Sequence, residues 1–145
     1  MSANKQKGFT LIELLVVISI IAILSVIGLV AYNTFLKNAR DSKRQSDLKF
    51  IQSSLEEYHA DQHYYLPGTT LGSSITNSTK TYLTTVPKDP KDGSAYSYAA
   101  QPGGCATVTC TSYCLSASLE NPGSTKPPEG TCVNPLNYNF TVTRP

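Results

Sequence analysis

The stretch that decides the fold reads K-G-F-T-L-I-E-L-L-V-V-I-S-I-I-A-I-L and occupies residues 7–24. It opens a longer apolar run, in which the 19 residues from Leu14 to Tyr32 carry no charge. A helix of that length extends about 28 Å, close to the roughly 30 Å thickness of a bilayer core. The sequence therefore predicts one helix that can span a membrane, with a single carboxylate, Glu13, near its start.

Three interpretations of this segment compete. A cleaved secretory signal has an apolar region of roughly 7–15 residues and a small-x-small exit, but this run is longer and no clean A-x-A site follows it. A plain membrane anchor fits the length and leaves Glu13 unexplained, because a charge near the centre of a membrane helix costs about 2.5–3.5 kcal/mol on insertion scales. A position of Glu13 at the lipid headgroups would make that cost smaller.

The third interpretation depends on five residues that precede or begin the apolar run. Their order and spacing resemble the class III signal of type IV pilins and type II secretion pseudopilins; they are Gly8, Phe9, Thr10, Leu11 and Glu13. The resemblance implies that a prepilin peptidase cleaves between Gly8 and Phe9 and then methylates the new terminal amine of Phe9. It also implies a role for Glu13 in filament assembly, in which its carboxylate meets the Phe9 amine of a neighbouring chain. Such a pair is far stronger at low dielectric than in water.

The resemblance covers residues 1–65 strongly and residues 82–120 moderately, the latter through the stretch P-K-D-P-x-x-G-x-x-Y-x-Y. It implies an α+β fold of pilin-like "lollipop" form, with a long N-terminal helix packed by its second half on a small antiparallel three-stranded sheet. The implied organisation is a leader at 1–8, a membrane-spanning and filament-core helix at 9–32, and a globular domain at 33–145 that includes the second half of the helix.

The second half of the helix carries one apolar stripe. Leu48, Ile51, Leu55 and Tyr58 are spaced by 3, 4 and 3 residues, which is typical of a helix that packs one face on a core. We expect the helix to run from Phe9 to about residue 61. The opposite face is predicted to be polar and to carry Lys43, Arg44, Lys49, Glu56, Glu57 and Asp61.

Three later segments alternate apolar and polar residues and are predicted to be strands: 94–100, 112–119 and 136–142. Turn-forming Pro, Gly and Asn residues separate them. An antiparallel meander of these strands against the helix stripe would bury one face of each. The segment 68–81 is predicted to be a polar loop.

The four cysteines lie in the last third of the chain and permit three full pairings. No C-x-x-C pair suggests zinc or thioredoxin chemistry, and a small exported domain uses an even set of cysteines for disulfides. We favour Cys105–Cys110, closing the loop between the first two strands, and Cys114–Cys132, joining the second strand to the third. His59 and His63 are four residues apart but lack the glutamate of a zincin motif, so no metal site is predicted.

The charge balance and motif content argue against several classes of function. Twelve basic and ten acidic residues give a net charge of +2, which is not the basic surface of a nucleic-acid binder. No G-x-S-x-G or P-loop motif indicates an enzyme, and no cofactor is expected. The leading hypothesis is a structural subunit of a type IV pilus-like filament. Its partners would be copies of itself in a helical filament, prepilin peptidase, a pilus or secretion assembly platform, and the bilayer before assembly.

The expected location is the cytoplasmic (inner) membrane, in a single pass with the C-terminal domain outside, and then an extracellular filament on the cell surface. The count of cations favours the opposite orientation, because two lysines precede the span and four cations follow it; the family resemblance implies the leader inside. Two alternatives stay open. One is a type II secretion pseudopilin. Pseudopilins often carry an Asp-rich calcium loop near the C-terminus, and residues 114–145 contain only two acidic residues. We therefore expect no calcium loop, and this alternative is slightly less favoured. The other is a single-pass membrane-anchored domain with a binding or enzymatic role.

Overall fold

The computed structural model of the chain describes residues 8–121 and 139–143. The chain divides into two compact units, Met1–Leu36 and Lys37–Pro145. The long helix α1, Leu11–Gln62, contributes to both units. Its bounds confirm the predicted helix to within two residues at each end.

In the first unit, the apolar side chains of α1 are exposed within the described part of the chain. Every large apolar side chain from Leu11 to Leu29 whose exposure is described is solvent-exposed, from 45% at Val17 to 88% at Leu11. The most apolar window of the helix is long and apolar enough to cross a membrane, and none of it is buried within the chain. A surface of this kind requires lipid or other protein chains to cover it.

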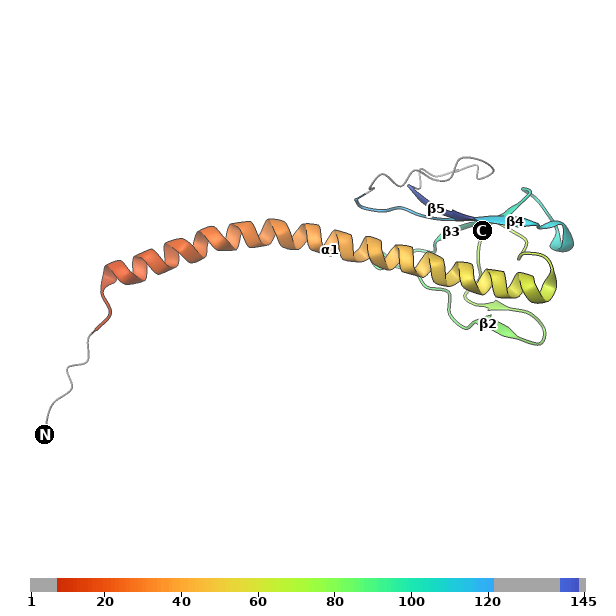
Figure 1. The fold of residues 1–145 in the computed structure, drawn as a ribbon, viewed down its shortest axis with the longest axis horizontal. Helices are drawn as coiled ribbons and strands as arrows, with labels where there is room; N and C mark the ends of the chain where they lie inside the picture. The colour runs from red at the N-terminus through yellow and green to blue at the C-terminus, as the bar shows by residue number, and fades with distance from the viewer. Residues whose placement is uncertain (1–7, 122–138, 144–145) are drawn as a thin grey trace, which may run out of the picture. The chain divides into compact units, whose positions relative to one another are not determined.

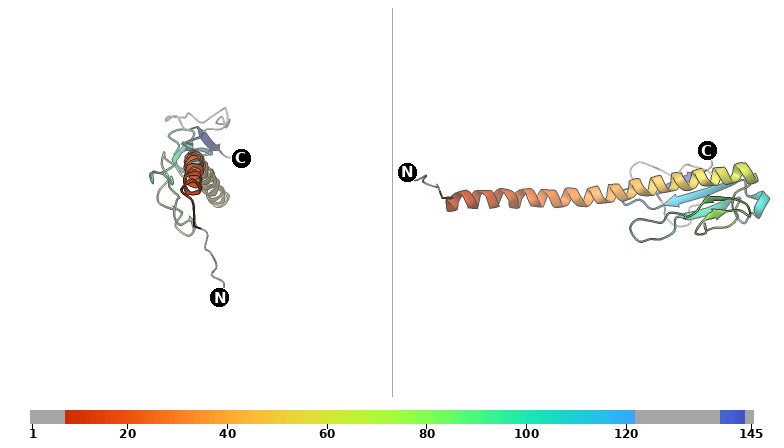
Figure 2. Two further views of the ribbon diagram at one scale, coloured as in Figure 1. Left: turned by 90° about the vertical axis from the view of Figure 1, so that its left-hand side faces the viewer. Right: turned by 90° about the horizontal axis from the view of Figure 1, so that it is seen from below.

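In the second unit, α1 packs on a three-stranded sheet (Figure 1, Figure 2). The strands are β3 (Ser97–Gln101), β4 (Ser112–Ala117) and β5 (Phe140–Thr143), in the order β3-β4-β5 with both pairs antiparallel. This confirms the predicted meander. The third strand was predicted to begin at residue 136, and residues 136–138 lie outside the described part.

The predicted helix stripe forms the centre of the core. Leu48, Ile51 and Leu55 are fully buried and Tyr58 is buried. The sheet supplies the other side of the core, where Tyr98 lies opposite Leu115 on the neighbouring strand. The apolar spacing of 3, 4 and 3 residues thus correctly identified the buried face from Leu48 onward.

The predicted polar loop at 68–81 is wrong in part, because it contains secondary structure. Strands β1 (Ile75–Thr76) and β2 (Thr81–Leu83) form a separate antiparallel pair. Ile75 is fully buried and is paired with Leu83, so one apolar residue from each strand enters the core. Strands of two and three residues are too short for alternation to reveal them.

The prediction for the opposite helix face is also wrong at two positions. Arg44 is buried, and Glu56 is half-buried, where it accepts hydrogen bonds from the hydroxyl groups of Tyr65 at 2.8 Å and Tyr113 at 2.9 Å. These two charged side chains can be buried or half-buried because each forms hydrogen bonds with polar partners inside the domain. The prediction is confirmed for the other four residues, which are exposed: Lys43, Lys49, Glu57 and Asp61.

One predicted disulfide is confirmed. Cys105 and Cys110 are joined across the β3–β4 connection, with their Cα atoms 5.2 Å apart. The backbone N–H of Tyr65 donates to the carbonyl oxygen of Cys110 at 2.9 Å, which attaches this loop to the chain just after α1. The second predicted pair, Cys114–Cys132, remains a prediction because Cys132 lies outside the described residues.

Candidate functional site

The residues that flank the predicted cleavage point lie before the first turn of α1. Gly8 and Phe9 are not helical, and the Phe9 side chain is 78% exposed. A Cβ atom added to Gly8 would meet no heavy atom within 4 Å. Packing against the described residues therefore gives no reason for glycine at position 8.

Thr10 and Glu13 form a capping box at the start of α1. The backbone N–H and the hydroxyl of Thr10 donate to Oε2 of Glu13, at 2.8 and 2.7 Å. The backbone N–H of Glu13 donates in return to Oγ1 of Thr10 at 3.3 Å. The pattern Thr-x-x-Glu before an apolar run is the sequence signature of this motif. Sequence analysis missed this local role of Glu13, although the signature was present.

An open hollow lies beside the same carboxylate. It has a volume of about 350 Å³ and is lined by Phe9, Ile12, Glu13, Val16 and Val17. Apart from Glu13, its wall is apolar. Glu13 is therefore both part of the helix cap and the one charged group in an apolar surface.

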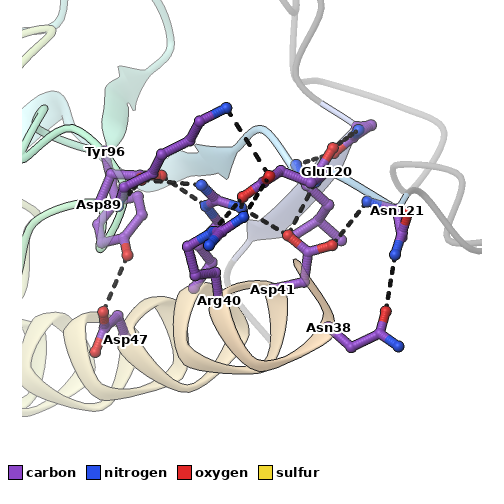
Figure 3. A network of polar contacts seen from close by, with 12 residues as sticks. Asn38, Arg40, Asp41, Asp47, Asp89, Tyr96, Glu120 and Asn121 are labelled. Atoms are coloured by element: carbon purple, nitrogen blue, oxygen red, sulfur yellow. Dashed lines mark hydrogen bonds and ion pairs between the residues drawn. The ribbon is translucent and has the colours of Figure 1, made fainter. Parts of the chain in front are cut away.

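A second polar constellation lies in the other unit, and Figure 3 shows several of its members. It centres on Arg44, whose side chain is 3% exposed. Its guanidinium group donates two hydrogen bonds to Asp89, from Nε at 2.6 Å and from Nη2 at 2.9 Å. Nη1 donates to Asp41 at 2.7 Å and to Glu120 at 3.1 Å. One arginine thus joins α1 to the loop before β3 and to the segment after β4.

Asp41 and Arg40 continue this network along the helix. The carboxylate of Asp41 accepts the backbone N–H groups of Glu120 at 2.9 Å and of Asn121 at 2.8 Å. Arg40 makes a bidentate pair with Glu120, at 2.6 and 2.8 Å. The side chain of Asn121 also donates to Asn38 at 2.8 Å (Figure 3). The helix therefore holds the chain at the point where it leaves β4 through both backbone and side-chain contacts.

The ion pairs shift the acidity of the groups involved. The hydrogen bonds from Arg40, together with those from Arg44, lower the pKa of Glu120 to about 2. The hydrogen bonds from Arg44 lower the pKa of Asp89. Both carboxylates are therefore ionised at neutral pH and balance the cations that face them. In this arrangement each of these charged groups is paired, and the pairs hold α1 to the loop before β3 and to the segment after β4. We call this ion-pair network the clamp.

These shifts predict a loss of stability in acid. A carboxylate whose pKa is lower in the folded state stabilises the fold above its unfolded value, about 4 for Glu, and that contribution disappears as the pH falls through the folded value. We expect the thermal midpoint of the full-length protein in detergent to fall between about pH 4 and pH 2. In Glu120→Gln the midpoint at pH 7 should be lower and its dependence on acid shallower. An unchanged acid profile in that variant would contradict the clamp.

The sequence contained a signal for this network. The buried stripe of α1 continues toward the N-terminus with the same spacing of 3 or 4 residues, through Arg44 and Asp41. Opposite charges three residues apart on a buried face indicate a satisfied ion pair. The motif P-K-D-P-x-x-G-x-x-Y also takes part in these contacts. Its Asp89 accepts from Arg44. Its Tyr96 donates from the hydroxyl to Oδ2 of Asp47 at 3.0 Å.

No metal site emerges from the described residues. Within residues 8–121 and 139–143, no group of three or more His, Cys, Asp or Glu side chains could hold a metal ion. His59 is half-buried and stacks on Tyr65, with ring centroids 4.4 Å apart. His63 is exposed.

Comparisons with known proteins find similar sequences for the N-terminal segment. A family model described as the prokaryotic N-terminal methylation motif matches residues 3–29. Prepilin peptidase-dependent protein D of Escherichia coli K12 is 67% identical over 36 residues, 25% of each chain. A fimbrial protein of Neisseria meningitidis serogroup B is 35% identical over 75 residues, 52% of this chain and 44% of that protein. Type II secretion system core protein G of E. coli K12 is 36% identical over 66 residues, 44% of each.

These similarities lie in part of the chain only. The chain spans between a quarter and less than half of the length of these curated relatives. No solved structure matches it at a significant level. The motif match includes Gly8, Phe9 and Glu13, the residues that the sequence had singled out. The chain therefore carries the prepilin-type N-terminal methylation motif, with relatives among fimbrial proteins, type IV pilins and the core protein of type II secretion.

Proposed function

We propose that this chain is a structural, non-enzymatic subunit of a type IV pilus-like filament. One observation carries the proposal: the methylation motif leads directly into a helix whose apolar side chains are exposed among the residues that the structure describes. In a bilayer, lipid covers this surface. In a filament, the helices of other subunits cover it, so the subunit can exist in both states without exposing it to water.

Processing follows from the residues before the helix. The peptidase that acts on this motif cleaves between Gly8 and Phe9 and methylates the Phe9 amine. The non-helical backbone and the exposure of Phe9 support this step, because an enzyme can reach an extended segment more easily than a helix. The subunit then sits in the cytoplasmic membrane in a single pass, with its C-terminal domain outside, until an assembly platform moves it into the filament.

Glu13 fixes the register of the assembled helices. Its carboxylate pairs with the Phe9 amine of a neighbouring subunit, in surroundings from which the packed apolar helices exclude water. A charge pair in such surroundings is strong, and either charge alone is costly. Only one axial stagger of two helices satisfies both charges, so the pair selects that stagger.

A second candidate is a pseudopilin of a type II secretion system. The similarity to core protein G of E. coli, over 44% of each chain, favours it specifically. Processing, membrane insertion and helix packing are common to both candidates, and the destination of the filament distinguishes them. A filament recovered by shearing from the cell surface supports the pilus.

The intact mass of protein in sheared surface filaments tests the proposal. We expect the mass of Phe9–Pro145 plus one methyl group. Before reduction it should be lower by four hydrogens, which corresponds to the two predicted disulfides. A full-length, unmethylated chain found only in membranes would contradict the proposal. The chain would then be an anchored domain, and Glu13 an interfacial carboxylate.

A further inference from the structure

One exposed carboxylate of the second unit has no ion-pair partner among the described residues. It is Asp92, in the turn before β3. The other exposed carboxylates described in this unit, Glu57 and Asp61, both pair with Lys80. Hydrogen bonds from Ser94 lower the pKa of Asp92, so its carboxylate is ionised at neutral pH. Its negative charge is therefore available to a cation from another molecule.

Two neighbouring hollows open beside this carboxylate. The first has a volume of about 280 Å³ and a mainly apolar lining that includes Leu71 and Val86. The second has a volume of about 190 Å³, is polar and is lined in part by Asp92. Ala95 and Tyr96 line both hollows, which therefore adjoin each other. A partner that fills both needs an apolar group and a cation side by side.

The polar hollow carries an excess of negative charge. Two cations line it, Arg44 and Lys91, against three carboxylates, Asp89, Asp92 and Glu120. Arg44 is held by the clamp, and the ammonium group of Lys91 lies 3.9 Å from Glu120. Asp92 supplies the excess charge, so the hollow favours a cation as its occupant.

The outer face of α1 presents an apolar group and a cation next to each other. The side chain of Phe50 is 57% exposed, and Lys49 is exposed and forms no ion pair with the described residues. Their neighbours Leu48 and Ile51 are fully buried, which fixes Lys49 and Phe50 on the outside of the helix. Val108 is the other large apolar side chain exposed in the described part of this unit, but it lies between two threonines.

We propose that Lys49 and Phe50 of one subunit dock into the two hollows of a second copy of this chain. The Lys49 ammonium group meets Asp92, and the Phe50 ring enters the apolar hollow. The inference rests on the proposed function, because it places the second units of neighbouring subunits in direct contact. The two surfaces differ, one on a helix and one on loops, so the contact is heterologous and can repeat from copy to copy into a helical filament.

The charges in this contact make it testable by reversal. A single ion pair at a surface contributes little to stability, so neutralising one partner is a weak test. Two like charges brought together at an interface are strongly unfavourable. Reversing one charge should therefore oppose the contact, and reversing both should restore an attractive pair.

The experiment uses the full-length chain, expressed in cells that assemble filaments. It measures sheared filament protein per processed subunit, with intact mass as the report on processing. We expect Lys49→Glu and Asp92→Lys each to lower the yield at least about tenfold. The double variant should return to within about twofold of the wild type, because the two residues act together. Lys37→Glu is the matched control, since it makes the same charge change at another exposed lysine of α1.

Asp92→Asn separates the effect of charge from an effect on folding. Asparagine keeps an acceptor for the backbone N–H of Ser94, which Oδ1 of Asp92 accepts at 2.9 Å. Its thermal midpoint in detergent should equal that of the wild type, and its filament yield should lie between those of the wild type and Asp92→Lys.

Three results would overturn the contact and leave the proposed function intact. They are normal yields from both single reversals, a double variant no better than the single ones, and an equal loss in Lys37→Glu. Wild-type cells without filaments of this chain would overturn the proposed function, and this contact with it.

Discussion

Replacement of Glu13 by glutamine is expected to reduce the yield of assembled filaments at least about a hundredfold, without blocking cleavage after Gly8. Glutamine keeps the length of the side chain and an acceptor oxygen but removes the charge. In a filament the Phe9 amine of the neighbour would then be buried without a counter-charge. Breaking a buried ion pair from one side costs about 3–5 kcal/mol, which corresponds to a factor of a hundred or more in an equilibrium constant.

The measurement is the ratio of sheared filament protein to processed subunit in the membrane. Ser19→Ala is the control, since it alters a polar residue of the same helix whose hydroxyl donates to the carbonyl of Leu15 at 2.7 Å. It should assemble like the wild type. Filaments of Glu13→Gln at the control level would show that the carboxylate has no part in assembly. Accumulation of the uncleaved chain would instead place its role in processing.

The second large effect is expected from Arg44→Ala, which should lower the free energy of unfolding of the second unit by about 3–5 kcal/mol. The substitution leaves Asp41, Asp89 and Glu120 close together without the cation that bridges them. Because domains of this size are stable by only about 5–15 kcal/mol, the loss is a large part of the total. For Arg44→Lys the free energy of unfolding should lie between those of the wild type and Arg44→Ala. Lysine keeps the charge, but an ammonium group cannot reproduce the bidentate contact with Asp89.

Tyrosine fluorescence during denaturant unfolding of the full-length protein in detergent measures this loss. The chain contains nine tyrosines and no tryptophan, and several of the tyrosines lie in the core of the second unit. Lys37→Ala is the control, since Lys37 is exposed and a surface substitution changes stability by about 0.5 kcal/mol or less. Equal unfolding midpoints for Arg44→Ala and the control would mean that the network contributes nothing net.

Local pattern was enough to predict the long helix, its buried stripe and the meander. The spacing of Leu48, Ile51 and Leu55 matches the 3.6-residue period of a helix, and the alternation in 112–119 matches the two-residue period of a strand. The spacing of Gly8, Phe9 and Glu13 is equally local, and the three residues lie within 3–29, the stretch that the methylation-motif model matches. The Cys105–Cys110 pair was favoured because it closes a short loop between two adjacent strands.

Contacts between distant residues were harder to predict. The pairing of Ile75 with Leu83 joins segments too short to show a period. Arg44 was predicted to lie on the polar face. Its spacing from Asp41 is a local signal of an ion pair, but nothing local shows that Asp89 and Glu120, 45 and 76 residues away, lie beside it. Glu56 was also predicted on the polar face, and one of its two partners, Tyr113, comes from β4, 57 residues away.

The sequence by itself determined which segment is apolar enough to enter a membrane, where the processing motif lies and which helix face is buried, because each depends on neighbours along one helix or strand. Only the tertiary structure decided which charges are buried. A charge enters a protein interior when opposite charges and hydrogen-bond donors surround it, and for Arg44 those groups come from three separate parts of the chain.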